Sequence, residues 1–294
     1  MVTRRWAVLL VVLLLLAGCL PMPEPFHSPL TFVSPMAPDM THRAYIPMFT
    51  VPPPKVGVGM AWNYLDCDYP LMVGATWYYN WGARPPACPG VEAVPMIWSA
   101  NWDEDMVLPS GPYLLLFNEC DGAGQCNASP ELAAVSWHRI ETLLPKTKLV
   151  GPNVSQWGLA WLLDWHAAYI RLYGKAPRIW ALGVHCYNPA EWCKDWIGQN
   201  IALAQDWTQS GKVWVTEWAI PACLYPGPGA DAWAIEQSDE LMQWMLGNPD
   251  VEREAWFIAR YRNRVCNTDL ITADGTLTAY GEWHRSAVQT EFMR

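Results

Sequence analysis

Short apolar runs alternate with longer stretches of helical character from residue 55 to the end of the chain. Eight of the apolar runs are short and rich in β-branched or aromatic residues, which predicts strands. These runs cover residues 55–62, 71–81, 93–99, 112–119, 147–155, 178–187, 212–218 and 254–261. Helices are predicted over 129–144, where Ser129 is the N-cap and Pro130 the first helical residue, and over 230–248, where Gly247 is a stop signal.

Strands that alternate with helices are typical of a parallel α/β fold, and eight of them favour a (β/α)8 TIM barrel. The first four strands are joined by only about ten to twenty residues each, so helices in the N-terminal half must be abbreviated or replaced by turns. A doubly wound open sheet is the alternative, but no glycine-rich phosphate-binding loop follows the first strand. We therefore expect one barrel domain over residues 55–290.

The first 54 residues lack this alternation. A basic start is followed by an apolar run that is short for a membrane span and ends in "LAGC" at Cys19, which resembles the lipobox of bacterial lipoproteins. This pattern predicts a lipoprotein-type signal peptide over residues 1–18 and acylation of Cys19, with an ordinary secretory signal as the alternative. Residues 19–54 are proline-rich and predict an extended tether. The expected location is extracellular or at the cell surface, with the lipid anchor as the only membrane contact.

Composition narrows the classes of partner. Apolar residues make up 52% of the chain and charged residues 16%, which indicates a globular protein rather than a disordered one. The net charge is −9 and no patch is rich in Lys or Arg, so nucleic acid is not an expected partner. The 20 Trp and 12 Tyr exceed ordinary usage and suit stacking against sugar rings as well as core packing. We expect a monomer that uses no cofactor.

Without Cys19, eight of the nine cysteines remain, and an even number in an exported chain predicts disulfides. Two pairs are close in sequence within turn-like stretches and are the first choices, namely Cys120–Cys126 and Cys186–Cys193. Two further pairs follow only by elimination among the 105 possible pairings, namely Cys67–Cys88 and Cys223–Cys266. A metal site in "HCYNPAEWC" is the alternative, but its spacing matches no zinc pattern, so no metal is expected.

Two predicted strands end in a glutamate. The apolar run 112–119 ends in Asn118 and Glu119, and the run 212–218 places Glu217 next to its last residue. A carboxylate at the end of a buried strand is costly unless it is needed there. Three βα steps separate the two glutamates, so both are expected on the catalytic rim of the barrel. Either alone could be a salt-bridged or solvated rim residue, but a pair facing a cleft suits glycoside hydrolysis.

Seven motifs occur in an order and at a spacing that resemble a known family: "WYYNWG", "VPMIW", "FNE", "GPNVS", "VHCY", "VWVTEWA" and "AWF". Together they are similar to glycoside hydrolase family 128, endo-β-1,3-glucanases on short (β/α)8 barrels within the clan A retaining glycosidases. The likeness covers roughly residues 55 to 285. The chain departs from the family pattern at Cys120, where Pro is usual, and at Cys186, where Trp is frequent. We interpret both changes as disulfides that rigidify loops of the rim.

The resemblance implies roles for several residues. Glu119 would be the acid/base and Glu217 the nucleophile, while Asn118 would hold the 2-hydroxyl of the sugar. Tyr187 could donate a hydrogen bond to Glu217 and hold it in line. His185 lies two residues earlier on the same strand face, where a buried structural histidine is as reasonable as a substrate contact.

Aromatic residues end the second predicted strand. By alternation Trp77, Tyr79 and Trp81 share one face, and Tyr78 and Asn80 the other. We expect Asn80 and at least one aromatic residue of this group to contact glucan, and the sequence does not say which. Trp256 on the last strand is a candidate platform beneath the cleaved sugar, because clan relatives place an aromatic residue there; core packing is the alternative.

The expected function is therefore that of an extracellular retaining endo-β-1,3-glucanase that cleaves laminarin-like or curdlan-like glucans by double displacement. One alternative is a clan A glycosidase that acts on another β-glycan, such as a mannan or a mixed-linkage glucan. A second alternative is a non-catalytic surface lipoprotein that binds β-glucan. Both glutamates are intact in the sequence, which argues against that second alternative.

Overall fold

Nine short parallel strands form one sheet in the order β3-β2-β1-β9-β8-β7-β6-β5-β4. Their bounds are β1 Val56–Gly59, β2 Trp77–Tyr79, β3 Glu92–Ala93, β4 Met96–Ile97, β5 Tyr113–Leu116, β6 Lys148–Val154, β7 Ala181–Cys186, β8 Lys212–Trp218 and β9 Val251–Trp256. The first and last members of this order, β3 and β4, are consecutive pieces of the chain interrupted at Pro95, so the sheet closes on itself. The predicted (β/α)8 barrel is confirmed, and an open doubly wound sheet is excluded.

Hydrogen bonds on both sides of Pro95 carry this closure. The amide of Val94 donates to the carbonyl of Tyr78 on β2 (2.8 Å), and that of Leu115 on β5 donates to the carbonyl of Pro95 (3.0 Å). Proline has no N–H to offer, which explains why the predicted third strand, 93–99, is split into two short ladders.

The computed structural model describes residues 55–102, 106–109, 111–225, 227–261 and 266–292. The predicted signal peptide, the acylated Cys19 and the tether lie outside the described residues. Among the helices that are described, none combines the length and the apolar character needed to cross a membrane.

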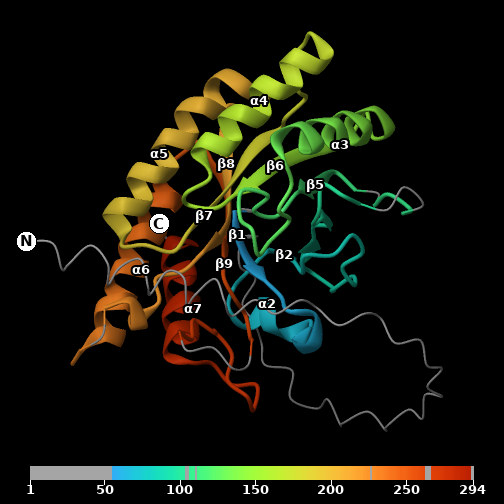
Figure 1. The fold of residues 1–294 in the computed structure, drawn as a ribbon. Coiled ribbons are helices and arrows are strands. Elements are labelled where there is room, and N and C mark those ends of the chain that lie inside the picture. The colour runs from blue at the N-terminus through green and yellow to red at the C-terminus, as the bar shows by residue number, and fades with distance from the viewer. Residues whose placement is uncertain (1–54, 103–105, 110, 226, 262–265, 293–294) are drawn as a thin grey trace, which may run out of the picture. The chain divides into compact units, whose positions relative to one another are not determined.

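The long helices belong to the C-terminal half of the barrel (Figure 1). They are α3 Pro130–Leu143, α4 Leu159–Tyr173, α5 Ala190–Trp207, α6 Ala230–Gly247 and α7 Ala279–Phe292. Ser129 caps α3 as predicted, because its hydroxyl accepts a hydrogen bond from the amide of Leu132 (3.2 Å). The N-terminal half has only the 3-10 helix η1 (Trp62–Tyr64) and the five-residue α2 (Asp68–Met72) in its described part. The prediction of abbreviated helices in this half is confirmed.

Most predicted strands are shorter in the structure, and two of them also include residues that the prediction assigned wrongly. The first part of the predicted strand 71–81 is wrong, since Leu71 and Met72 belong to α2 and the strand itself begins at Trp77. The last strand begins three residues earlier than predicted, at Val251, and ends at Trp256 rather than at residue 261. Its opening residues include charged Arg253, which sequence reasoning placed outside the strand but which is only 5% exposed.

Side-chain alternation divides the core into two layers. Trp77 and Tyr79 on β2 point into the barrel, where they pack with Leu115 and Trp214. Tyr78 between them belongs to the larger layer that lies between the sheet and the helices. The predicted alternation along this strand is therefore confirmed.

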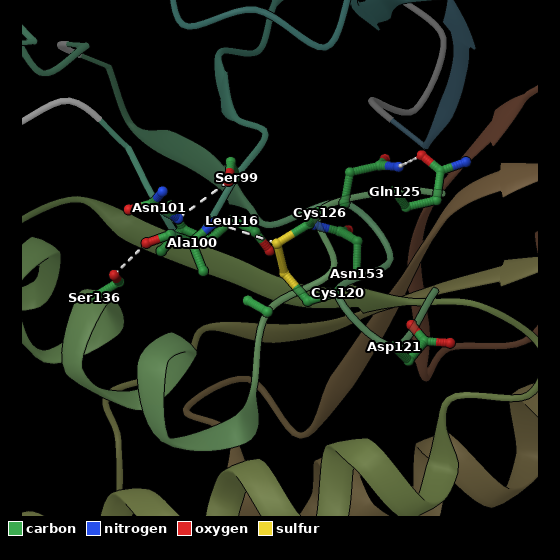
Figure 2. The surroundings of a disulfide bond; sticks show 12 residues. Ser99, Ala100, Asn101, Leu116, Cys120, Asp121, Gln125, Cys126, Ser136 and Asn153 are labelled. Carbon is green, nitrogen blue, oxygen red and sulfur yellow. Dashed lines mark hydrogen bonds between the residues drawn. A yellow bond between two sulfur atoms is a disulfide. The ribbon is translucent and has the colours of Figure 1, made fainter. Parts of the chain in front are cut away.

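Four disulfides are present, and their pairing is the predicted one: Cys67–Cys88, Cys120–Cys126, Cys186–Cys193 and Cys223–Cys266. All of them lie in or beside segments that follow the C-terminal ends of strands. Figure 2 shows the Cys120–Cys126 bond, where Cys126 Sγ also accepts a hydrogen bond from the amide of Ala100 (3.2 Å). The cross-links therefore gather on the face of the barrel that carries the two candidate glutamates.

Candidate active site

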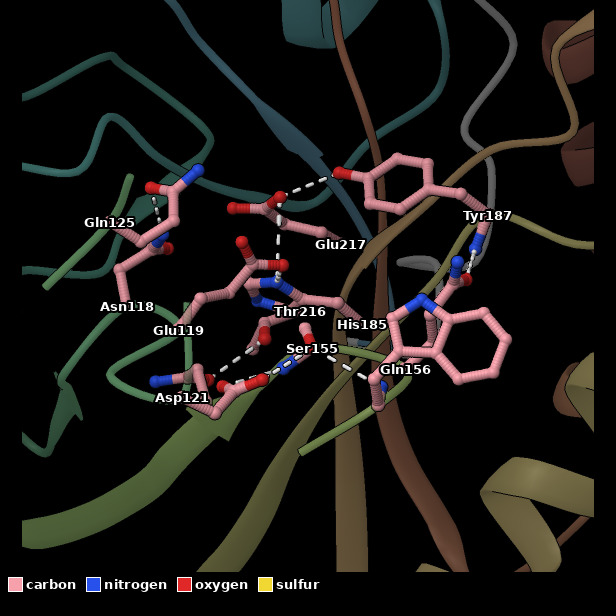
Figure 3. A network of polar contacts seen from close by, with 12 residues as sticks. Asn118, Glu119, Asp121, Gln125, Ser155, Gln156, His185, Tyr187, Thr216 and Glu217 are labelled. Carbon is pink, nitrogen blue, oxygen red and sulfur yellow. Dashed lines mark hydrogen bonds and ion pairs between the residues drawn. The ribbon is translucent and has the colours of Figure 1, made fainter. Parts of the chain in front are cut away.

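The structure brings Glu119, Glu217 and His185 together at the C-terminal ends of β5, β8 and β7 (Figure 3). One oxygen of each carboxylate and one nitrogen of the imidazole all lie within 4.8 Å of one another. His185 Nδ1 is 2.8 Å from Glu119 Oε1 and 3.5 Å from Glu217 Oε2. The imidazole thus lies between the two carboxylates, which meet on one rim of the barrel.

Two donors fix the carboxylate of Glu217. Tyr187 Oη donates to Oε2 over 2.6 Å, and Trp81 Nε1 donates to Oε1 over 2.8 Å. The side chain is only 7% exposed, so these hydrogen bonds act where water competes little. Glu217 is therefore held in one orientation, with the Tyr187 contact that sequence reasoning suggested.

Glu119 has the environment of a proton donor. Burial raises the pKa of its carboxyl and outweighs the hydrogen bond and the charge of His185, which lower it. The nearby carboxylates of Glu217 and Asp121 raise this pKa further. The protonated form of Glu119 is favoured as a result.

His185 and two tyrosines respond to the same carboxylates. Burial lowers the pKa of His185, but the charge of Glu217 and the hydrogen bond to Glu119 outweigh it, so the pKa is raised overall. Burial, reinforced by Glu217, raises the phenol pKa values of Tyr79 and Tyr187 well above their usual range. Both tyrosines are therefore neutral hydrogen-bond donors, and the raised pKa of His185 favours its charged form beside the two carboxylates.

Comparison with known families identifies the chain. Residues 59–284 match the family model described as glycosyl hydrolase catalytic core. The chain belongs to this family. The match lies within the expected barrel domain. Together with the similar solved structures, it establishes that the protein is a glycoside hydrolase. A sequence search of curated proteins found no match.

Solved structures similar to this hydrolase include several family 128 enzymes. The endo-β-1,3-glucanase of Pseudomonas viridiflava superposes with a TM-score of 0.65 and 26% identity, covering 79% of this chain and 97% of its own. The curdlan-specific exo-β-1,3-glucanase of Blastomyces gilchristii gives 0.63 and 26%, with 81% and 100% covered. An endo-β-1,3-glucanase variant of Amycolatopsis mediterranei bound to laminaripentaose gives 0.63 and 26%, with 80% and 99% covered. The resemblance to family 128 is confirmed.

Two residues of the hydrolase site have left-handed backbone conformations that orient their side chains. Glu119 has φ 46° and Trp81 has φ 60°, a region that costs non-glycine residues about 1–3 kcal/mol each. Phe117, two residues before Glu119, shares the feature with φ 57°. The end of β5 is therefore bent so that Glu119 turns towards His185 instead of continuing the strand.

Asn153 on β6 joins the two glutamate-bearing strands, and sequence reasoning did not select it. Its carbonyl accepts from the amide of Glu119 (2.7 Å), and its Oδ1 accepts from the hydroxyl of Thr216, the neighbour of Glu217 (2.8 Å). A Cβ on Gly183 would lie 2.0 Å from that same Oδ1, so glycine makes room for the amide. The signal was available in "GPNVS", where an asparagine interrupts a buried strand just as Asn118 and Glu119 do.

Asn118 lies beside the cluster and keeps a free acceptor. Its Nδ2 donates to Gln125 Oε1 (3.3 Å), whereas its buried Oδ1 has no hydrogen-bond partner among the described residues. An oriented, desolvated amide oxygen next to Glu119 suits a substrate hydroxyl.

Three other predicted contact residues are not brought to the cluster. Tyr78 points outward and donates to the carbonyl of Pro86, and Asn80 is fully buried, with Oδ1 accepting from the amide of Gly82. Trp256 is fully buried against α7, and its Nε1 donates to the carbonyl of Thr268 (2.8 Å). The alternation of β9 explains this outward position.

Phe257, one residue after Trp256, contacts the site instead. Its ring meets Trp81 and Tyr187 edge to face, with centroids 5.7 and 5.5 Å away. Sequence reasoning missed this residue because it chose the larger ring of the "AWF" motif rather than the one on the inward face.

The donor set of Glu119, His185 and Glu217 could in principle hold a metal ion. The oxygens of Glu217 are already bound by Tyr187 and Trp81, and His185 Nδ1 shares a hydrogen bond with Glu119. Two carboxylates bridged by an imidazole and flanked by neutral donors suit proton transfer better than metal coordination.

Proposed function

We propose that this hydrolase is a retaining endo-β-1,3-glucanase, with Glu119 as the acid/base and Glu217 as the nucleophile. The observation that carries the proposal is the approach of the two carboxylates, whose nearest oxygens lie within 4.8 Å of each other. Retaining glycosidases place their carboxyl groups about 5–5.5 Å apart, whereas inverting enzymes leave about 6.5–9.5 Å for a water molecule. The separation therefore favours double displacement.

The environments of the two glutamates support these roles. In the first step an oxygen of Glu217 attacks the anomeric carbon, and the proton of Glu119 passes to the leaving glycosidic oxygen. Water then gives a proton to Glu119 and attacks the same carbon, which releases Glu217 as a carboxylate. The raised pKa of Glu119 fits the proton donor, and the donors Tyr187 and Trp81 keep Glu217 oriented for attack.

The structural neighbours support the substrate class. Two glutamates are replaced in the Amycolatopsis mediterranei variants crystallised with laminari-oligosaccharides, and their spacing differs by one residue from that of Glu119 and Glu217. Asn118 is proposed to bind the 2-hydroxyl, and Trp81 and Phe257 to form the aromatic surface around the cleaved sugar. Endo action is proposed because the Pseudomonas viridiflava and Amycolatopsis mediterranei enzymes are endo-glucanases, although the Blastomyces gilchristii enzyme acts as an exo-glucanase.

We further propose that the enzyme acts as a monomer outside the cell, attached through acylated Cys19 and the tether 19–54. The support is the sequence alone, namely the "LAGC" motif and the proline-rich segment. Replacement of Cys19 by Ala should release the protein from membranes and leave hydrolysis unchanged. A variant that stays in the membrane fraction would contradict the anchor without touching the catalytic proposal.

The decisive experiment replaces Glu217 with Ala and measures reducing ends released from laminarin, curdlan, mannan and mixed-linkage glucan. Hydrolysis should be abolished, and added azide should restore part of it with an activated glucoside, giving a product of inverted configuration. Glu240→Ala is the matched control, because this glutamate on α6 is exposed and its partners among the described residues are Lys194 and Gln237. Full activity in Glu217→Ala, or wild-type activity confined to mannan, would overturn the proposal.

A further inference from the structure

A cavity lies between the loop after β6 and the start of α5. The cavity measures about 340 Å3, a size typical of small-molecule sites. Three tryptophans line it, namely Trp157, Trp192 and Trp196, together with the polar side chains of Gln156, Asp195 and Gln199. Aromatic faces combined with amide and carboxylate groups are the surface that a sugar ring, apolar on its faces and polar at its edge, requires.

Trp157 is unusually exposed for its size, with 62% of its surface accessible. Its ring lies 5.3 Å from that of Trp192, at an interplanar angle of 60°, so the two indoles form an angled wall. Aromatic side chains that lie together at the surface, as Trp157 and Trp192 do, are typical of a binding surface.

The wall is fixed in place before any ligand arrives. The Cys186–Cys193 disulfide ties the first turn of α5, which carries Trp192, to the last residue of β7. The amide of Trp157 donates to Ser155 Oγ (3.1 Å), and the same hydroxyl donates to Asp121 in the loop after Glu119. Preorganised aromatic rings bind with less loss of conformational entropy.

Hydrogen bonds connect the cavity to the catalytic cluster. Gln156 Oε1 accepts from the amide of Tyr187 (2.8 Å), and the hydroxyl of Tyr187 holds Glu217. Trp196, the buried floor of the cavity, donates from Nε1 to the carbonyl of His185 (3.1 Å). The cavity is therefore built onto the two residues that flank Cys186 on the catalytic rim.

We propose that this cavity is a distal glucosyl-binding subsite, which holds a part of the glucan chain remote from the bond that is cleaved. The inference rests on the proposed function for the identity of the polymer. Asp195 and the absence of any cation among the lining residues favour a neutral polysaccharide over an anionic one. Asp195 and Gln199 have no side-chain hydrogen bond within the described part of the chain, which leaves them available for hydroxyl groups.

The test measures binding separately from catalysis. In the full-length Glu217→Ala background, which should not hydrolyse, calorimetry compares laminarihexaose with laminaribiose before and after Trp157→Ala. The Kd for laminarihexaose should rise about 5- to 20-fold, the loss expected for one aromatic stacking partner, and that for laminaribiose should stay the same. Trp207→Ala is the control, because Trp207 ends the same helix α5 and stacks on His166 instead (3.8 Å).

Hydrolysis by the otherwise wild-type chain provides the second readout. Trp157→Ala should lower kcat/KM for laminarihexaose by a similar factor and leave that for laminaritriose within about twofold. Equal effects on both oligosaccharides, or no change in the Kd for laminarihexaose, would overturn the subsite while hydrolysis by the wild type still upheld the proposed function. A wild type that hydrolyses no β-1,3-glucan would overturn the proposed function, and the binding measurement would still decide the subsite.

Discussion

The two ends of the barrel differ in the partners that surround their buried charges. At the N-terminal ends of the strands, Arg253 lies among Trp214, Tyr113 and Trp77, with its Cζ 4.4, 4.6 and 5.6 Å from their ring centroids. Its guanidinium also pairs with Glu92 (2.8 Å). At the C-terminal ends, two carboxylates converge on one histidine, and Glu119 and Trp81 adopt left-handed conformations.

This difference indicates that the N-terminal end of the barrel contributes to stability, whereas the C-terminal end is less stable and carries the reactive groups. Aromatic faces attract a cation, so Arg253 is partnered on several sides and closes the barrel interior. Two carboxylates at close range repel each other, and burial of Glu119 adds to the cost, which makes that end reactive instead of stable. Substitutions at the two ends should therefore separate activity from stability.

The largest effect is expected at the C-terminal end. Glu119→Gln should lower kcat on laminarin about 10³-fold, because the leaving glycosidic oxygen loses its proton donor. The free energy of unfolding should stay the same or increase, since a buried carboxyl beside Glu217 is replaced by a neutral isostere. Steady-state kinetics and urea unfolding of one preparation measure both quantities, and a loss of less than tenfold on laminarin would contradict the role of Glu119.

The opposite separation is expected at the N-terminal end. Arg253→Met should lower the free energy of unfolding by about 2–4 kcal/mol, because a desolvated cation–π cluster and its pairing with Glu92 are lost. The kcat/KM of the folded fraction should change less than about twofold. Lys148→Met is the control: Lys148 lies over Trp180 (3.7 Å) at the same end but is only half-buried, so it should cost under about 1 kcal/mol. Equal losses of unfolding free energy in both variants would contradict a particular stabilising role for the Arg253 cluster.

Glu254, on the outer face of β9, extends the comparison, because it is a fully buried carboxyl whose burial outweighs the charge of Lys55. Burial raises its pKa from 4.5 to about 8, against the hydrogen bond from Trp218 Nε1 (2.6 Å). The folded protein thus binds more protons than the unfolded chain between these pH values, so stability falls as pH rises through this window. Glu254→Gln should remove this fall, with a gain over the wild type of about 2–4 kcal/mol at pH 8 and almost none at pH 4.

Urea unfolding of both proteins at several pH values measures this gain. A difference between variant and wild type that does not change with pH would show that Glu254 is ionised in the folded state.

The smallest effect concerns His185. Since its charge and hydrogen bond lower the pKa of Glu119, His185→Gln should raise that pKa further while an amide still donates to Glu119. The alkaline limb of the kcat/KM profile should then move to higher pH, because Glu119 stays protonated longer. A profile that only decreases in height would assign His185 a structural role instead of an electrostatic one.

The sequence predicted the features that follow from period and chain direction. Alternation placed Trp77, Tyr79 and Trp81 on one face, and the three βα steps between Glu119 and Glu217 placed both on one rim. Both inferences depend only on the regular geometry of strands and on the rule that parallel strands end on the same side.

The sequence was less informative where tertiary partners decide. The last strand was predicted to begin after Arg253, whose buried position depends on three aromatic rings and Glu92. Asn153 and the inward position of Phe257 depend on partners 63 and 70 residues away, namely Thr216 and Tyr187. No local pattern encodes such contacts, because they arise only when the sheet closes.

The position of the four disulfides has a consequence for where this hydrolase can work. All four cross-links lie on the catalytic rim. Among the eight cysteines only Cys186 belongs to a strand of the sheet, at its last residue. A reduced chain should therefore still form its barrel, but the loops around the two glutamates would lose their covalent cross-links. We expect the reduced protein to fold but to hydrolyse glucan more slowly, so that oxidation of these eight cysteines completes the enzyme.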